Sequence, residues 1–123
     1  MITGLGNDIA DCRRIERMMR KYGDQFLDHF LTPAEKTESK GRSSYCAGRW
    51  AAKEAVSKAL GCGIGANCAF TDIEIIDNEA GKPEVKLSGA AEITAKNQKA
   101  DRIHLSISHE RHYAVATVIL ETL

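Results

Sequence analysis

A chain of 123 residues, of which 43% are apolar, has the length and composition of one globular domain with a single modest core. Its 17 basic residues balance its 17 acidic ones, which argues against a wholly basic nucleic-acid binder but leaves room for a local basic patch. No stretch approaches the ~20 apolar residues that span a bilayer, and residues 1–10 do not have the pattern of a secretory signal. We therefore expect one soluble, cytoplasmic domain over residues 1–123.

The four cysteines are expected to be free thiols used as small packing residues. Cys12, Cys46, Cys62 and Cys68 show no CxxC spacing, so the pattern favours neither a zinc site nor a redox motif. A reducing cytoplasm fits such usage best.

The N-terminal part predicts a strand followed by two helices. Residues 1–9 are typical of a short strand, with glycines where the backbone bends or where another segment approaches closely. Asp11 is expected to cap a helix that runs to about Tyr22 and stops at Gly23. A shorter helix is expected over residues 25–31.

The next two helices have clear start and stop signals. Thr32 is the expected N-cap, Pro33 fits the first turn, and Glu35 completes a capping box. The longest helix is predicted over Ser44–Leu60, with Gly61 ending it.

The C-terminal half predicts two pairs of strands around one helix. Residues 70–77 and 84–87 are typical of strands joined by a turn at 78–81, and Ser88 is expected to cap a helix that runs to about Gln98.

The last portion predicts a hairpin, because residues 103–108 alternate between apolar and polar before a turn at 110–112. The return strand, 113–120, is almost wholly apolar, so we expect it to be buried on both faces or at a subunit contact. Strands and helices mix without regular βαβ alternation, which predicts the α+β class.

Asp8 is the first candidate site residue. A carboxylate at the end of a strand, beside small flexible residues, suits a hard cation such as Mg2+. The alternative is a turn former or a helix cap.

Glu54 and Lys58 are the second candidate, because they stand four residues apart on one face of the long helix. The pair is either an exposed ion pair or a metal carboxylate beside a phosphate-binding ammonium group. Ala51, Ala55 and Ala59 line another face, which predicts close packing of this helix and a charged pair that faces a cleft.

Arg49 on the same helix is directed away from Glu54. Helical residues advance about 100° each, which places the two side chains roughly 140° apart. One small ligand does not easily touch both, so if both residues serve a site, this geometry favours different copies of a pocket shared between subunits.

Ser106, Ser108 and His109 form the third candidate, at the end of a predicted strand. Hydroxyls and an imidazole suit a phosphate or a ribose, although such residues are also ordinary at a hairpin turn.

A basic cluster on the first helix is the fourth candidate and consists of Arg13, Arg14, Arg17, Arg20 and Lys21. It suits an acidic protein or a nucleic-acid backbone, and a solvated helix face is the alternative explanation. One competing function is therefore a metal-independent adaptor that binds through this helix.

Five segments together resemble the holo-acyl-carrier-protein synthases, the small 4'-phosphopantetheinyl transferases. They are GLGNDIADCRRI (4–15), FLTPAE (30–35), AGRWAAKEAVSKALG with GIG (47–65), FTDIEI with GKP (70–83) and SISHERHYAVATVI (106–119). They follow the family's order and span nearly the whole chain. The resemblance implies the family's α+β fold, a mixed or antiparallel sheet packed against a long helix.

The resemblance also implies roles for individual residues. Asp8 and Glu54 look like Mg2+ ligands, and Lys58 resembles the lysine near the diphosphate of coenzyme A. Arg49 and His109 resemble residues that reach the 3'-phosphate, with Ser108 beside His109.

Other implied contacts involve the ends of the substrates. Gly81-Lys82-Pro83 resembles the turn beside the adenosine end of coenzyme A. Arg14 resembles the arginine that grips the acidic helix of the carrier protein, and its basic neighbours are expected to assist. The family's short members are homotrimers with sites between subunits, which agrees with the opposed directions of Arg49 and Glu54.

The implied reaction is attack by a serine hydroxyl of apo-acyl carrier protein on the β-phosphate of coenzyme A, which releases 3',5'-ADP and serves fatty acid biosynthesis. Neither nucleic acid nor membrane is an expected partner. Glu54 and a metal-bound water are alternative bases. Another Mg2+-dependent enzyme of phosphate esters on the same scaffold remains the second alternative function.

Two positions differ from the usual family pattern. Trp50 replaces a common phenylalanine, which is a modest change. Asn7 adds an amide beside Asp8, which is expected to bond either that carboxylate or a metal-bound water.

Overall fold

The elements alternate irregularly between helices and strands in the computed structural model, which describes residues 1–123. In chain order they are β1 (Ile2–Asp11), α1 (Cys12–Tyr22), α2 (Asp24–Phe30), α3 (Pro33–Ser39), α4 (Ser43–Ala59), the short 3-10 helix η1 (Phe70–Asp72), β2 (Ile73–Asp77), β3 (Pro83–Leu87), α5 (Gly89–Asn97), β4 (Arg102–His109) and β5 (Tyr113–Glu121). This mixture confirms the predicted α+β class.

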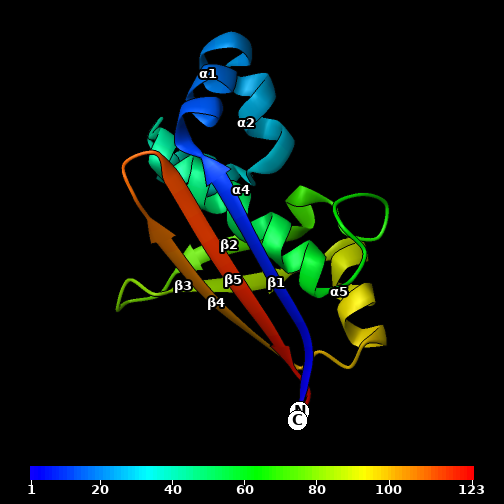
Figure 1. Cartoon of the computed structure of the whole chain (residues 1–123). Helices are drawn as coiled ribbons and strands as arrows, with labels where there is room; N and C mark the ends of the chain where they lie inside the picture. The colour runs from blue at the N-terminus through cyan, green and yellow to red at the C-terminus, as the bar shows by residue number, and fades with distance from the viewer.

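The main sheet has three antiparallel strands in the order β1-β5-β4, and β2 and β3 form a separate antiparallel hairpin. Figure 1 shows α1 and α2 at one end of the long strands and both termini at the other. The two ends of the chain lie side by side and are connected by a hydrogen bond, in which the Met1 amino group donates to the Thr122 carbonyl at 2.9 Å. The predicted sheet packed against one long helix is thus confirmed.

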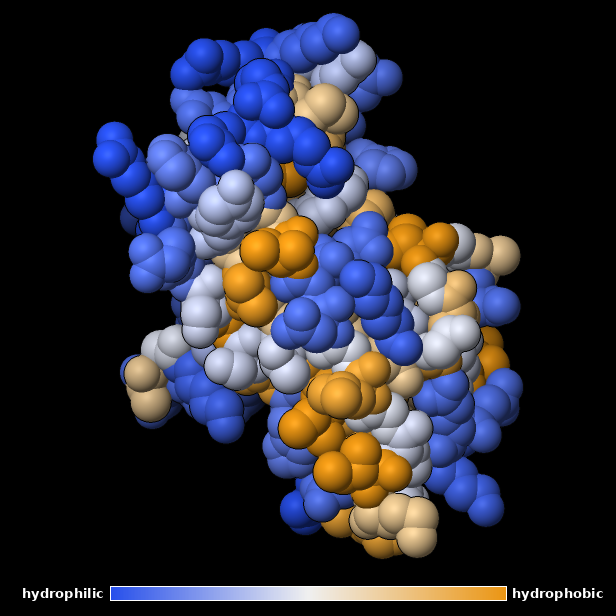
Figure 2. Space-filling view, viewed as in Figure 1, coloured by the Kyte–Doolittle hydropathy of each residue, from blue (hydrophilic) through white to orange (hydrophobic).

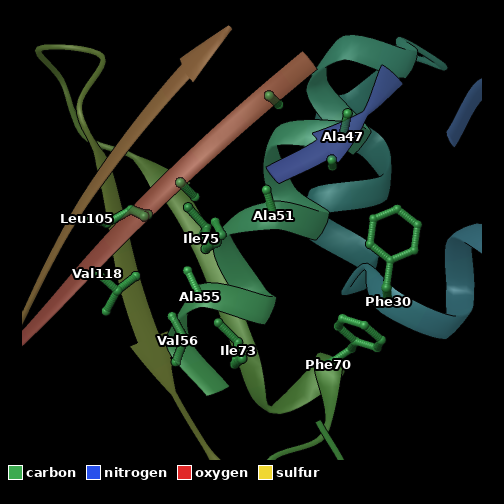
Figure 3. Packing of buried hydrophobic residues seen from close by; sticks show 14 of the residues in the cluster. Phe30, Ala47, Ala51, Ala55, Val56, Phe70, Ile73, Ile75, Leu105 and Val118 are labelled. Atoms are coloured by element: carbon green, nitrogen blue, oxygen red, sulfur yellow. The ribbon is translucent and has the colours of Figure 1, made fainter. Parts of the chain in front are cut away.

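Helix α4 packs unusually close to β1. A Cβ atom on Gly6 would lie 2.8 Å from the Ala59 nitrogen and 2.9 Å from the Ala55 carbonyl carbon, and Gly4 meets the same helix at Ala59. Only glycine therefore fits at these positions. The alanine face of α4 is buried as predicted, between the sheet and the aromatic side chains seen in Figure 3.

The sheet has one buried and one open face. On β5, Ala114, Ala116, Val118 and Leu120 are buried, whereas the residues between them are only half-buried or exposed. Within one chain this strand is therefore not buried on both faces, because α4 covers a single face, and the alternative of a subunit contact stays a prediction. Figure 2 shows exposed apolar groups following one another along the open face of the sheet.

The opposite side of α4 is covered by the β2–β3 hairpin and by aromatic residues. Phe26, Phe30, Trp50 and Phe70 form one cluster, with ring centroids 4.7 Å apart for Trp50 and Phe70. The strand expected from Phe70 begins only at Ile73. Residues 70–72 form η1 instead, because the Asp72 carboxylate accepts the Ala69 amide and bends the chain.

The predicted helix ends are largely correct. Asp11 caps α1 through the Arg13 amide, and Thr32 and Glu35 form the expected capping box. Helix α4 begins at Ser43 and ends at Ala59, each one residue earlier than expected.

Ser88 stands at the N-cap of α5 as predicted, but its side chain makes no capping bond. Its hydroxyl donates to the Asp72 carbonyl at 3.4 Å. The cap comes from the Asp72 carboxylate, which accepts the Ala91 amide at 3.3 Å and so binds η1 to α5.

Three of the four free cysteines fit the predicted packing role. Cys12, Cys46 and Cys68 are buried, whereas Cys62 is exposed in the loop after α4. Burial raises the pKa of Cys46 to about 11 and that of Cys68 to about 12. Both thiols are therefore poorly reactive near neutral pH. No helix has the length and apolar character required to cross a membrane.

Candidate active site

Asp8 and Lys58 meet where β1 crosses the C-terminal half of α4. Even-numbered residues of β1 face the helix, which turns the Asp8 side chain inward beside Gly6. The Lys58 ammonium lies 2.9 Å from the Asp8 carboxylate and 3.1 Å from the Asn7 carbonyl oxygen. Asp8 thus lies inside a strand and pairs with Lys58, so it is neither a turn former nor a helix cap.

Glu54 joins this pair from one turn earlier on α4. Partial burial raises the pKa of Glu54, and the nearby Asp8 charge raises it further, whereas Lys58 and Arg14 lower it. Two carboxylates and two cations therefore gather in one place from β1, α1 and α4. A partly buried like-charge pair is costly without a cation, and such pairs are typical of functional sites.

These donors fit Mg2+ in one particular way. The chain has no cluster of three or more histidine, cysteine, aspartate or glutamate side chains that would hold a metal. Mg2+ commonly uses one or two carboxylates and completes its octahedral shell with substrate phosphates and water. Asp8 and Glu54 match that donor set. The arrangement suits an ion that binds together with a diphosphate.

Asn7 plays neither of its predicted roles. Neighbouring residues of a strand point to opposite faces, so the Asn7 amide lies on the open face of the sheet, away from Asp8. It donates to the Thr117 hydroxyl at 2.8 Å and to the Ala116 carbonyl at 3.1 Å. The expectation that it bonds Asp8 or a metal-bound water is wrong.

Arg49 points away from the acidic pair, as its helical position predicted. Its side chain is only 8% exposed, and it donates to the Asp77 carboxylate at 3.1 Å. The guanidinium also stacks on the Tyr45 ring, 4.4 Å from the centroid. The Arg49 Nε and the Tyr45 hydroxyl are buried without a hydrogen-bond partner, beside a hollow of about 220 Å3.

The Gly81-Lys82-Pro83 turn is held in place beside Arg49. Asp77, which binds Arg49, pairs directly with Pro83 across the base of the β2–β3 turn. Gly81 has a φ of +83°, which glycine adopts without strain. The Asn78 carboxamide oxygen accepts the Lys82 amide at 3.0 Å and closes the turn.

The serines and the histidine of β4 separate onto two faces. Ser106 and Ser108 lie on the open face of the sheet, and His109 turns toward α4. The His109 Nε2–H bonds the Ser44 carbonyl oxygen at 3.1 Å. A Cβ atom on Gly48 would lie 2.7 Å from that nitrogen, so Gly48 makes room for the ring. The three residues do not form one site within a chain.

The basic residues of α1 have unequal freedom. Arg13 is bound to the Asp11 carboxylate and the Tyr113 hydroxyl, Arg20 is paired with Glu16, and Lys21 lies over the Tyr22 ring. Arg17 makes no ion pair or ring contact and is exposed.

Arg14 links the basic face to the acidic site. Its guanidinium lies 5.9 Å from the centroid of the Trp50 ring, and its charge lowers the pKa of Glu54. It also borders a hollow of about 150 Å3, whose other lining residues are Ile15, Met18, Phe26 and Trp50.

Sequence reasoning missed several residues that shape these sites. Asp77 and Gly48 act through long-range contacts that no local pattern reveals. Tyr45 stands four residues before Arg49, a spacing that indicates stacking on a helix. The fully buried pair of Lys53 and Glu35 was also missed.

Comparisons with known proteins agree with this geometry. The family model described as the 4'-phosphopantetheinyl transferase superfamily matches residues 4–118. A holo-[acyl-carrier-protein] synthase of Vibrio parahaemolyticus is 47% identical over 98% of both chains.

Two solved structures have the same fold. The holo-(acyl-carrier-protein) synthase of Bacillus anthracis, in complex with CoA (3',5'-ADP), is 41% identical with a TM-score of 0.84 and covers 100% of this chain and 99% of its own. The holo-[acyl-carrier-protein] synthase of Neisseria meningitidis is 38% identical with a TM-score of 0.91, over 99% of this chain and 100% of its own.

The fold and the matches along the whole chain thus define the class of protein as a phosphopantetheinyl transferase. The chain belongs to the 4'-phosphopantetheinyl transferase superfamily, and the relatives that it matches along its length are holo-[acyl-carrier-protein] synthases.

Proposed function

We propose that the chain acts as a single domain that transfers 4'-phosphopantetheine from coenzyme A to a serine of apo-acyl carrier protein. The products are holo-acyl carrier protein and 3',5'-ADP, and the reaction requires Mg2+. The observation that carries the proposal is the convergence of Asp8, Glu54 and Lys58 from β1 and α4. The coenzyme A complexes of relatives support the choice of donor.

Transfer of a phosphate group depends on positioning and on neutralising developing charge. Asp8 and Glu54 would hold Mg2+, which polarises the diphosphate when bound. Lys58, half exposed beside Asp8, is placed to stabilise charge on the departing phosphate. Glu54 would be one base for the serine proton, and water polarised by the bound ion would be the alternative. The raised pKa of Glu54 favours proton uptake at this carboxylate.

The adenosine end of coenzyme A is assigned to the N-terminal half of α4 and to the β2–β3 hairpin. Arg49 and His109 are proposed to bind the 3'-phosphate, with Ser108 nearby, and the 81–83 turn to flank the adenosine. The unpartnered Arg49 Nε and Tyr45 hydroxyl support an anion site, because buried donors without acceptors are costly.

A homotrimer would bring these separated groups together. Leu5 and Ile9 are 67% and 62% exposed on the open face of the sheet, and Tyr113 is 43% exposed beside them. Such an apolar face on a structured sheet is typical of an interaction surface. We propose that other copies of the chain cover it, so that Arg49 of one copy and Glu54 of another serve one substrate.

The acidic carrier protein is proposed to dock on α1. Figure 2 shows that strongly polar surface gathers over α1 and α2. Arg14 offers a cation beside an apolar hollow, a combination that suits an acidic helix with an apolar side chain. Arg17, Arg20 and Lys21 extend the same charge, and Arg13 assists from its pair with Asp11.

We place this activity in the cytoplasm, as part of fatty acid biosynthesis. The four cysteines are free thiols, a state that a reducing compartment maintains.

Intact-mass measurement tests the proposed reaction directly. Pure protein, Mg2+, coenzyme A and apo-acyl carrier protein are mixed, and the carrier is expected to gain one phosphopantetheine group. A carrier variant that lacks the acceptor serine should gain nothing. An unchanged carrier mass with active reagents contradicts the function, and carrier binding that is indifferent to Mg2+ and coenzyme A would favour an adaptor.

A further inference from the structure

The most deeply buried charges of the molecule lie outside the proposed catalytic groups. Lys53 and Glu35 are both fully buried, with 2.6 Å between the ammonium nitrogen and a carboxylate oxygen. The same ammonium donates to the Phe30 carbonyl at 2.6 Å and to the Phe70 carbonyl at 3.1 Å. All three donors of Lys53 therefore have an acceptor.

Glu35 connects this cluster to two further segments. One carboxylate oxygen accepts the Thr32 amide at 2.8 Å, and the other accepts the Ile75 amide at 2.9 Å. Lys53 and Glu35 thus bind α4 to the end of α2, the start of α3, η1 and β2 at one point. Figure 3 shows Phe30 and Phe70 together on this side of α4.

Stability alone does not account for such a pair. Replacing a buried ion pair with apolar residues of similar volume is often neutral or stabilising, because both charges lose their hydration on folding. The best-attested benefit of buried ionic groups is a unique arrangement of the surrounding elements.

Helix α4 needs such a constraint. Its contact with β1 consists of small residues such as Ala55 and Ala59 against glycine backbone, without large interlocking side chains. Apolar packing of this kind is nondirectional and restrains rotation of the helix about its axis only weakly. The hydrogen bonds of Lys53 are directional and lie on the side opposite that contact.

We infer that Lys53, held by Glu35, is a positioning residue that sets the rotation of α4 and thereby directs Glu54 toward Asp8. Glu54 follows Lys53 directly and points about 100° around the helix, so rotation of α4 would displace its carboxylate. This inference rests on the proposed function, because it concerns the metal carboxylate of that site. Lys53 touches no reacting group.

The test removes both charges together so that no unpaired charge stays buried. In Lys53→Met/Glu35→Gln, the glutamine oxygen still accepts a backbone amide. We expect the variant to fold, by circular dichroism, and to bind Mn2+ in the presence of coenzyme A about tenfold more weakly, by calorimetry. The kcat should fall by a similar factor and the KM for coenzyme A should change little.

Two controls separate positioning from general destabilisation. Lys36→Met removes an exposed pair with Asp24 and Asp28 and should leave Mn2+ binding unchanged. Ile73→Val removes one buried methylene group from the core, so it lowers stability with the Lys53 cluster intact and should also leave Mn2+ affinity unchanged.

The outcomes distinguish this inference from the function on which it rests. A folded double variant with normal Mn2+ affinity and kcat, or with losses equal to those of Ile73→Val, overturns the positioning role while transfer by the natural chain stands. If the double variant does not fold, Lys53→Met is the deciding variant, because the buried Glu35 can then take up a proton and stay neutral while it still accepts the Thr32 and Ile75 amides. The Mn2+ affinity of this variant should fall several-fold with folding intact, and an unchanged affinity overturns the role.

Discussion

Gly6→Ala should damage both stability and transfer, because β1 and α4 touch through their backbones. The added Cβ would lie 2.8 Å from the Ala59 nitrogen and 2.9 Å from the Ala55 carbonyl carbon, and closer still to the Ala55 carbonyl oxygen. Neither neighbour is a flexible side chain that can turn aside. Relief requires the strand and the helix to separate by about 1 Å, and overpacking of this kind costs about 3 kcal/mol.

This separation should also displace the catalytic carboxylate. Asp8 lies two residues after Gly6 on the same face of β1, so its distance from Lys58 and Glu54 would grow with the shift. A misplacement of about 1 Å can cost roughly a hundredfold in rate. A loss of about 3 kcal/mol would lower the Tm by roughly 10 °C in a chain of this size.

The assay compares thermal unfolding by circular dichroism with transfer to the carrier at a temperature where each variant is folded. Gly65→Ala is the matched control, since its Cβ would meet no atom within 4 Å and its φ is not positive. The control should unfold like the natural chain. A Gly6→Ala protein with normal Tm and normal transfer would refute the close backbone contact and its link to Asp8.

Four further results are expected. Glu54→Gln and Asp8→Ala should each abolish transfer, and ordinary turnover by either variant at millimolar Mg2+ would refute the ligand assignment. Without Mg2+, Glu54→Gln should raise the free energy of unfolding by less than about 1 kcal/mol, because it removes one of two like charges that lie close together. In calorimetry, Arg14→Glu should weaken binding of the carrier protein much more than binding of coenzyme A, and added salt should weaken binding of the carrier to the natural chain. An equal loss of affinity for both substrates would argue against docking at Arg14. Ile9→Lys should dissociate the proposed homotrimer in sedimentation experiments, and a variant that stays trimeric like the natural chain would exclude the open sheet face as the interface. The hydrogen bond from Arg13 holds the pKa of Asp11 at about 2 against an ordinary 3.8, so the stability that the Asp11 carboxylate contributes is present above pH 3.8 and is lost as the pH falls through 2. Chemical denaturation at a series of pH values should show this loss in the natural chain and not in Asp11→Asn, and the same dependence in both would contradict the pairing.

Local signals predicted the helix boundaries well. The caps at Asp11 and Thr32 and the stop at Gly23 each join residues within four positions of one another, so a short stretch of sequence shows both partners of the contact. The strand start at Ile73 was predicted three residues too early because it depends on where the Asp72 carboxylate binds.

The acidic site was predictable only in part. The spacing of Glu54 and Lys58 indicated a shared helix face, but their meeting with Asp8 depends on the close approach of β1 to α4. Lys53 resembles any surface lysine in sequence, and its burial depends on Phe30 and Phe70 carbonyls far along the chain.

The error at Asn7 and the separation of Ser108 from His109 have a simpler cause. Adjacent residues of a strand point to opposite faces, so Asn7 was never placed to bond Asp8, nor Ser108 to share a site with His109 in one chain. This alternation alone places Asn7 and Asp8, and likewise Ser108 and His109, on opposite faces of the sheet.

The central claim is that Asp8 and Glu54 share one divalent ion with the diphosphate of coenzyme A. A crystal of the protein with Mn2+ and coenzyme A tests it, because Mn2+ gives an anomalous signal. The account predicts one peak within about 2.5 Å of an oxygen from each carboxylate and of a diphosphate oxygen. An ion bound without either carboxylate, or side chains too far apart to share an ion within and between copies, would contradict it.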